Sequence, residues 1–165
     1  MEHQLDTWSL DREIVLTKVL NHPLNRVFAA WVDPQALAKW YGPAGFDIEN
    51  HEAGIRRGGV WRFDMVGMFE GRQQRFPTLV RYLEIVPNER IVMDYGTPDS
   101  DDPDRFRMTV TFDEQSDGKT VLTLRQLHPT VERRQTVIGF GAVEYGIETL
   151  DGLVSWMNGG DRNAA

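Results

Sequence analysis

The chain has 165 residues, a formal net charge of −7 and no cysteine. This length is typical of a single domain with a sizeable core, and an acidic surface disfavours a nucleic-acid partner because it repels phosphate. The absence of cysteine excludes disulfides, thiolate nucleophiles and zinc–thiolate sites.

The first residues of the chain, MEHQLDTWSL, have neither the basic region nor the apolar region of a signal peptide. No run of about 18 apolar residues follows, so we expect no membrane partner and a cytoplasmic location. We expect a flexible tail over residues 1–11, a single domain over residues 12–158 and a second flexible tail over residues 159–165.

One strand and two short helices are predicted next. Residues 12–20 (REIVLTKVL) are rich in β-branched and apolar side chains, which is typical of a strand. Pro23 suits the first turn of a helix, and apolar residues continue at helical spacing to Trp31. Asp33 is expected to cap a second helix, which starts at Pro34 and ends at the Gly-Pro pair of the WYGP string.

Alternating apolar and polar residues then predict a run of short antiparallel strands joined by tight turns. These strands are expected over residues 45–51, 60–66, 78–86, 90–95, 105–112 and 120–127. One face of the sheet is polar and can meet water. The other face carries aromatic and methionine side chains and needs a cover.

The period of the sequence changes to that of a helix between Val131 and Met157. An apolar stripe at spacings of three and four residues marks its expected buried face: Phe140, Val143, Ile147, Leu150, Val154 and Met157. Several glycines fall within this helix. Three explanations of these glycines are open: they allow the helix to approach the sheet closely, they leave room beside the helix, or they break the helix near residues 139–141.

This order of elements predicts an α+β fold of the helix-grip type. A curved antiparallel sheet wraps around a long C-terminal helix, and two short helices follow the first strand. The C-terminal helix is the only predicted element that is large enough to cover the apolar face. A grip of this kind easily leaves an internal cavity.

Several strings of the sequence match those of a known family. They are VFAAWVDP at 27–34, WYGPAGF at 40–46, GGVWRFDM at 58–65, YLEIVPNERIV at 82–92 and GIETLDGL at 146–153. The chain therefore resembles the START-like, birch-pollen-allergen-like superfamily (SRPBCC), and within it the bacterial homologues of the activator of the heat-shock-protein ATPase. The resemblance implies the same helix-grip fold. Ile147 stands where the family has a tryptophan, and His22 stands where it has an alanine.

The aromatic and methionine residues of the apolar face either line a pocket for an apolar or aromatic molecule or fill a packed core. Trp40 and Tyr41 are adjacent on a helix and point about 100° apart, so one is expected in the core and the other at the cavity rim. His128 is the best candidate for a polar group inside the cavity. The candidate ligand-binding residues are Trp40, Tyr41, Trp61, Phe63, Met65, Met93, Tyr95, Phe106, Met108, His128, Val143 and Ile147.

Three functions remain open. The sequence has no HExxH string, nucleophile–base motif or dinucleotide fingerprint, so we expect no metal, no cofactor and no catalytic residue. The first hypothesis is a non-enzymatic protein that binds an apolar small molecule, as a monomer or homodimer. The second is a cyclase or aromatase for a polyketide-like substrate, as elsewhere in the superfamily, with His128, Arg125 or Tyr95 as acid or base. The third is a chaperone partner that activates an ATPase through its surface.

Overall fold

The computed structural model describes residues 10–160. Its strands are β1 (Glu13–Leu20), β2 (Phe46–Ala53), β3 (Val60–Phe69), β4 (Arg72–Val86), β5 (Arg90–Gly96), β6 (Phe106–Glu114) and β7 (Thr120–Leu127). Its helices are the short 3-10 helix η1 (Leu10–Arg12), α2 (Leu24–Val32), α3 (Pro34–Trp40), α4 (Val131–Gly139) and α5 (Ala142–Met157). The expected tails lie largely outside the described residues, and the single domain over residues 12–158 stays a prediction.

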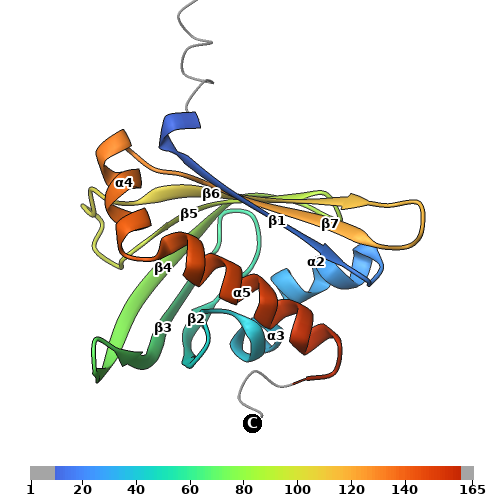
Figure 1. Cartoon of the computed structure of the whole chain (residues 1–165), viewed down its shortest axis with the longest axis horizontal. Coiled ribbons are helices and arrows are strands. Elements are labelled where there is room, and N and C mark those ends of the chain that lie inside the picture. Colours follow the sequence, from blue (N-terminus) through green and yellow to red (C-terminus); the bar gives the residue numbers. More distant parts are fainter. Residues whose placement is uncertain (1–9, 161–165) are drawn as a thin grey trace, which may run out of the picture.

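The strands of the described region form one antiparallel sheet in the order β1-β7-β6-β5-β4-β3-β2. β1 and β2 lie at opposite edges, although only α2 and α3 separate them in the chain. These two helices therefore carry the chain from one edge of the sheet to the other. Figure 1 shows the sheet curving around α5, which confirms the predicted α+β helix-grip fold.

The β3–β4 hairpin is longer than the sequence pattern indicated. β4 begins at Arg72 rather than at residue 78, and β3 continues to Phe69. Glu70 and Gly71 join them with φ angles of 53° and 83°. Positive φ at both central residues is the type I′ geometry that matches strand twist. The sequence has Glu-Gly there instead of the usual Asn-Gly, so the hairpin was not recognised.

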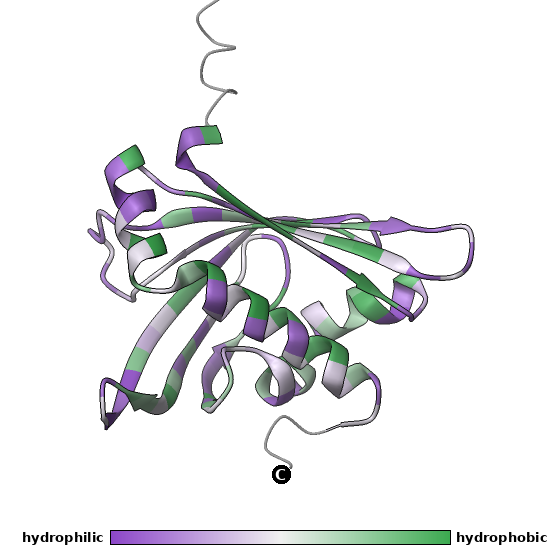
Figure 2. Cartoon of the chain, viewed as in Figure 1, coloured by the Kyte–Doolittle hydropathy of each residue, from purple (hydrophilic) through white to green (hydrophobic). Residues whose placement is uncertain are grey.

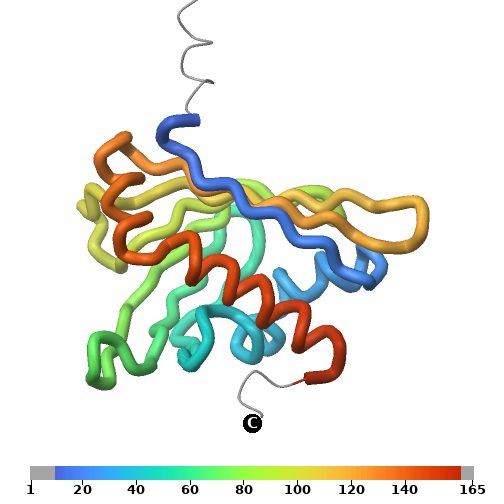
Figure 3. The backbone as a smooth tube through the Cα atoms, viewed as in Figure 1, coloured from blue at the N-terminus to red at the C-terminus, as the bar shows by residue number. Residues whose placement is uncertain are grey.

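The expected C-terminal helix is two helices, α4 and α5. They meet at Gly141, whose φ of 98° lies in the left-handed region that favours glycine. The carbonyl of Gly141 accepts a hydrogen bond of 2.9 Å from the backbone N–H of Tyr145, so the new helix starts there. The single long helix was therefore wrongly expected, and a break near residues 139–141, one of the alternatives for its glycines, is confirmed. Figure 3 shows α5 leaving this corner and crossing the open side of the curved sheet.

The buried side of α5 agrees only in part with the predicted stripe, which shares Leu150 with it. Its buried residues are Thr149, Leu150 and Leu153. Ile147 is 46% exposed and Phe140 is 66% exposed, so these members of the stripe were wrongly expected to meet the sheet. In Figure 2, apolar and polar bands alternate along α5, as expected for a helix with one buried side.

Two glycines explain how α5 is turned. A Cβ atom on Gly146 would lie 2.5 Å from Cδ1 of Leu16 on β1. A Cβ atom on Gly152 would lie 3.0 Å from the carbonyl oxygen of Trp40 at the end of α3. The helix thus places its glycines, as well as its leucines, against the rest of the molecule. Apolar spacing correctly placed Leu150, Val154 and Met157 against the core, but it missed the side that carries the glycines because it gives glycine no weight.

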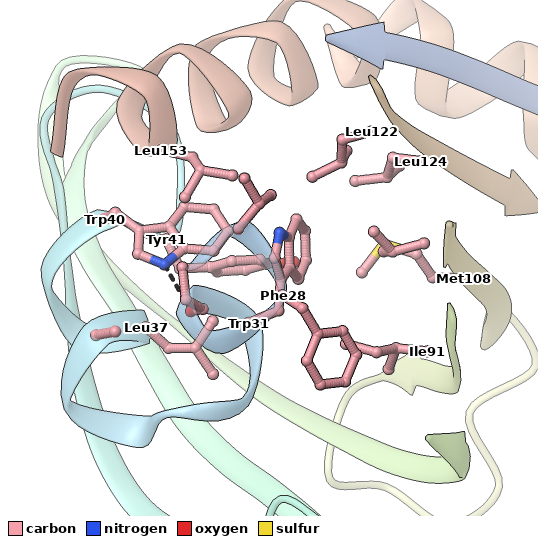
Figure 4. Close-up of a cluster of buried hydrophobic side chains, with 14 of the residues drawn as sticks. Phe28, Trp31, Leu37, Trp40, Tyr41, Ile91, Met108, Leu122, Leu124 and Leu153 are labelled. Carbon is pink, nitrogen blue, oxygen red and sulfur yellow. Dashed lines mark hydrogen bonds between the residues drawn. The ribbon is translucent and has the colours of Figure 1, made fainter. Parts of the chain in front are cut away.

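The two short helices also cover the sheet, because Phe28 and Trp31 of α2 contact the ring of Phe112 on β6 at 5.3 and 6.4 Å. The expectation that only the C-terminal helix could do so was therefore wrong. Trp31 of α2 and Trp40 of α3 meet edge to face at 4.8 Å. The indole N–H of Trp40 donates a hydrogen bond of 2.9 Å to the carbonyl of Ala30 (Figure 4). Asp33 caps α3 as predicted, because its carboxylate accepts from the backbone N–H of Gln35 at 3.0 Å.

Candidate functional site

A hollow of about 230 Å³ lies between α5 and the inner face of the sheet. It is lined by the turn after α3, by β3, β5, β6 and β7, and by α4 and α5: Tyr41, Gly42, Pro43, Met65, Tyr95, Phe106, Met108, Leu124, Gln126, His128, Val137, Ala142, Tyr145, Gly146 and Thr149. None of these residues is Asp, Glu, Lys or Arg. A charged occupant would lose its hydration without gaining an opposite charge, so the hollow favours a neutral one.

Half of the candidate residues line this hollow and half do not. Those in the lining are Tyr41, Met65, Tyr95, Phe106, Met108 and His128. Trp40, Trp61, Phe63 and Met93 are buried in the packed core instead. Trp61 and Phe63 stack on each other at 3.9 Å and contact the ring of Tyr41 at 5.2 and 6.0 Å. Val143 and Ile147 lie outside the lining, because α5 turns another side toward the sheet.

The two rings of the WYGP string are both buried and meet at 5.4 Å, but only the ring of Tyr41 also borders the hollow. Trp40 has 0% exposure and packs in the core (Figure 4). The backbone N–H of Tyr41 donates the last helical hydrogen bond of α3, to the carbonyl of Leu37. The φ and ψ angles of Tyr41 itself are extended. The chain leaves the helix at Tyr41, so its ring departs from the helical direction and reaches the hollow. Gly42, with φ of 94°, allows the sharp turn that follows.

Two tyrosine hydroxyls meet at the wall of the hollow. The hydroxyl of Tyr41 donates a hydrogen bond to that of Tyr95 at 3.3 Å. Burial raises the pKa of Tyr95 to about 12, and burial together with the nearby Tyr95 hydroxyl raises the pKa of Tyr41 well above its usual value. Both groups are therefore neutral hydroxyls at physiological pH.

His128 is the one imidazole in the lining, and it is 1% exposed. Its ring lies 4.7 Å from the ring of Phe106. Its Nε2 atom lies 2.9 Å from Oε1 of Gln126, whereas its Nδ1 atom is buried without a partner among the described residues. Burial, with the positive charges of Arg133 and Arg134 nearby, lowers the pKa of His128 to about 4. The ring is therefore uncharged at neutral pH.

The sequence pattern missed several residues of the lining. Leu124 and Gln126 lie two residues apart on β7 and so share one face, and this period could have identified both. Ala142, Gly146 and Thr149 come from the unexpected side of α5 and gave no comparable signal.

The hollow continues toward the surface. An adjoining hollow of about 170 Å³ shares Pro43, Met65 and Tyr145 with it. A surface groove of about 500 Å³ lies between the β3–β4 hairpin and the α4–α5 corner: Phe69, Glu70, Phe76, Val137, Phe140, Ala142 and Tyr145. Tyr145 belongs to all three linings, so the groove and the two hollows adjoin one another at this residue.

Other kinds of site find little support in residues 10–160. No group of three or more His, Asp or Glu side chains there could hold a metal ion. Arg125 is exposed, and its Nε atom bonds Glu13 at 3.2 Å instead of facing the hollow. In the same range, no helix is long and apolar enough to cross a membrane.

Solved structures with this architecture come from several bacteria. A protein from Chromobacterium violaceum is 28% identical, with a TM-score of 0.73 over 87% of this chain and 96% of its own. A protein from Arthrobacter aurescens is 20% identical, with a TM-score of 0.79 over 89% and 86%. The AHSA1 protein from Silicibacter pomeroyi is 20% identical, with a TM-score of 0.68 over 88% and 97%. No curated protein matches the chain.

The sequence itself places the chain in a family. The family model described as "Activator of Hsp90 ATPase homolog 1-like protein" matches residues 21–158, from the end of β1 to the end of α5. This match includes α2, α3 and every strand after them, and the fold is the START-like helix grip of the solved relatives. The chain therefore belongs to the family of activator of Hsp90 ATPase homolog 1-like proteins.

Proposed function

We propose that this protein binds a small apolar or aromatic molecule in the hollow between α5 and the sheet, without catalysing a reaction. The observation that supports this proposal is the hollow of about 230 Å³, whose lining has no Asp, Glu, Lys or Arg. Pockets for small molecules are typically concave and mostly apolar, with a few polar groups that orient the ligand. The hydroxyls of Tyr41 and Tyr95 and the imidazole of His128 are such groups here.

Binding is better supported than catalysis by the state of these groups. A general base works best when its pKa lies near the working pH, and the pKa of His128 is lowered to about 4. Burial raises the pKa of Tyr95 to about 12, so this hydroxyl stays protonated. Arg125, the third group that a cyclase-like reaction could use, points away and pairs with Glu13. These groups suit recognition of a ligand.

The proposal is tested by filling the hollow. Fragments with one aromatic ring are titrated into the purified protein, and binding is followed by calorimetry and by quenching of tryptophan fluorescence. The substitution Ala142→Phe adds a ring to the lining and is expected to lower affinity at least tenfold. Glu144→Phe adds the same ring at an exposed position in the same helical turn and should leave affinity unchanged. Equal binding by both variants, or no saturable binding by the parent protein, contradicts the proposal.

A second candidate function is a chaperone contact through the surface. Two large apolar side chains are exposed, Met68 by 61% and Phe140 by 66%, and Phe140 lies in the lining of the groove beside Phe69 and Phe76. Contiguous apolar patches on a surface mark binding sites. The family description names an activator of Hsp90 ATPase. This role would operate in the cytoplasm, with the protein as a monomer or homodimer. The purified protein should then raise the ATPase rate of Hsp90, and Phe140→Ser should reduce that effect. An unchanged ATPase rate at saturating protein contradicts this candidate.

A further inference from the structure

A second apolar site lies at the surface, between the β3–β4 hairpin and the α4–α5 corner. The groove there has a volume of about 500 Å³, more than twice that of the interior hollow. The adjoining hollow of about 170 Å³ shares Phe69, Phe76 and Tyr145 with it. Figure 1 shows the hairpin and the corner on the same side of the molecule. Sites for small molecules are concave and mostly apolar, with volumes of about 300–1,000 Å³, and the groove has this size.

One wall of the groove is a cluster of rings on the inward face of the hairpin. Met65 and Phe76 lie opposite each other in the register of β3 and β4, and Phe69 follows Met65 by four residues on the same face of β3. The ring of Phe76 meets the rings of Phe69 and Phe46 at 5.6 and 6.0 Å. Because these rings already pack on one another, the wall is formed without a ligand.

The opposite wall leaves apolar surface open to water. Phe140 lies between α4 and α5, and its side chain is 66% exposed. Tyr145 is 37% exposed, and both residues belong to the lining of the groove. Apolar surface that faces water is stabilised when another apolar surface covers it. The groove therefore offers two apolar walls to an apolar chain or ring.

The charges of the groove determine which end group suits it. Glu70 lies at the tip of the hairpin and is the one charged residue of the lining. Within residues 10–160, its carboxylate has no ion-pair partner. Neither the groove nor the adjoining hollow has Lys or Arg in its lining. A cation at this end would be attracted by the carboxylate, whereas an anion would be repelled.

We propose that the groove binds an amphipathic cation, a small molecule whose apolar part lies against Phe76 and Phe140 and whose protonated amine lies at Glu70. None of these three residues lines the interior hollow. The inference therefore goes beyond the proposed function and does not depend on it. A fatty acid would place a like charge beside Glu70, and a neutral chain would leave its carboxylate unused.

The charge is tested with three probes of equal chain length. At pH 7 octylamine carries a positive charge, octan-1-ol carries none and octanoate carries a negative charge. Calorimetry at low ionic strength should give the parent protein an affinity for octylamine about threefold above that for octan-1-ol, the size of an exposed ion pair, and the weakest affinity for octanoate. Glu70→Gln should remove the preference for the amine. Glu114→Gln removes the same charge at an exposed position outside both linings and should keep the preference.

The position of the apolar chain is tested with octan-1-ol, which has no charge. Phe140→Ser removes a wall of the groove and should lower the affinity at least threefold. Met68→Ser removes an apolar side chain of similar exposure, 61%, that lies outside both linings. This control should leave the affinity unchanged.

Four outcomes overturn the inference. They are the absence of saturable octylamine binding, equal effects of the two glutamine variants, equal effects of the two serine variants, and a parent dimer that light scattering finds as a monomer in Phe140→Ser. The last result would assign the groove to a second copy of the chain. Stimulation of Hsp90 that is lost in Phe140→Ser, without any binding of octylamine, would instead assign the groove to the chaperone. None of these results touches the hollow, so the proposed function stands or fails by its own test.

Discussion

Replacing His128 by phenylalanine should remove a defined part of the pH dependence of stability. In the folded protein the pKa of His128 is lowered to about 4, from 6.5 for an ordinary histidine, because the ring is buried with Arg133 and Arg134 nearby. Below pH 6.5 the unfolded chain binds a proton that the folded chain does not bind. The part of the free energy of unfolding that depends on His128 is therefore at its maximum above pH 6.5. It declines as the pH falls toward 4.

The size of this effect follows from the two pKa values. Because the pKa of His128 falls from 6.5 to about 4 on folding, full acidification lowers the free energy of unfolding by about 3 kcal/mol. About 2 kcal/mol of this is lost between pH 7.5 and pH 5. Carboxylates also titrate in this range, but they are common to the parent protein and to His128→Phe. The difference between the two proteins therefore isolates the imidazole.

Urea unfolding followed by tryptophan fluorescence measures this difference. The free energy of unfolding is determined for both proteins at several values between pH 7.5 and pH 4.5. The parent protein should lose about 2 kcal/mol more than His128→Phe on going from pH 7.5 to pH 5. Parallel curves for the two proteins would refute the reasoning, because they would mean that the folded state protonates His128 as easily as the unfolded state.

The remaining predictions concern the helices, and chemical denaturation checks each of them. Gly139→Ala should stabilise the protein by about 0.5 kcal/mol, because no atom lies within 4 Å of the new Cβ, whereas Gly141→Ala should cost about 1–2 kcal/mol at its φ of 98°. Equal effects of the two changes would contradict the left-handed corner. Ile147→Ala should cost less than about 1 kcal/mol and Leu150→Ala about 2–5 kcal/mol, since the first side chain is 46% exposed and the second 2%. The reverse order would contradict the burial of Leu150 and the exposure of Ile147. Asp33→Ala should cost about 1 kcal/mol through loss of the cap of α3, and no change would show that the cap is dispensable.

The sequence alone predicted the fold and most of its elements, because local rules govern them. Alternation of apolar and polar residues located β3, β5, β6 and β7, and the Asp-Pro pair located the start of α3. These signals depend on neighbouring residues only. The family strings indicated the helix-grip fold, and in that fold Tyr41, Met65, Tyr95, Phe106, Met108 and His128 line one hollow.

Only the tertiary structure shows which apolar residues pack in the core, which side of α5 faces the sheet and which buried atoms lack a hydrogen-bond partner. Whether Trp61 and Phe63 pack in the core or line the hollow depends on where the ring of Tyr41 lies, which is a contact between distant segments. The side of α5 that meets the sheet depends on the close approach at Gly146 and Gly152, and a glycine contributes no apolar period. The unpartnered Nδ1 of His128 likewise becomes visible only when every neighbour is in place, because hydrogen-bond satisfaction is a property of the packed molecule.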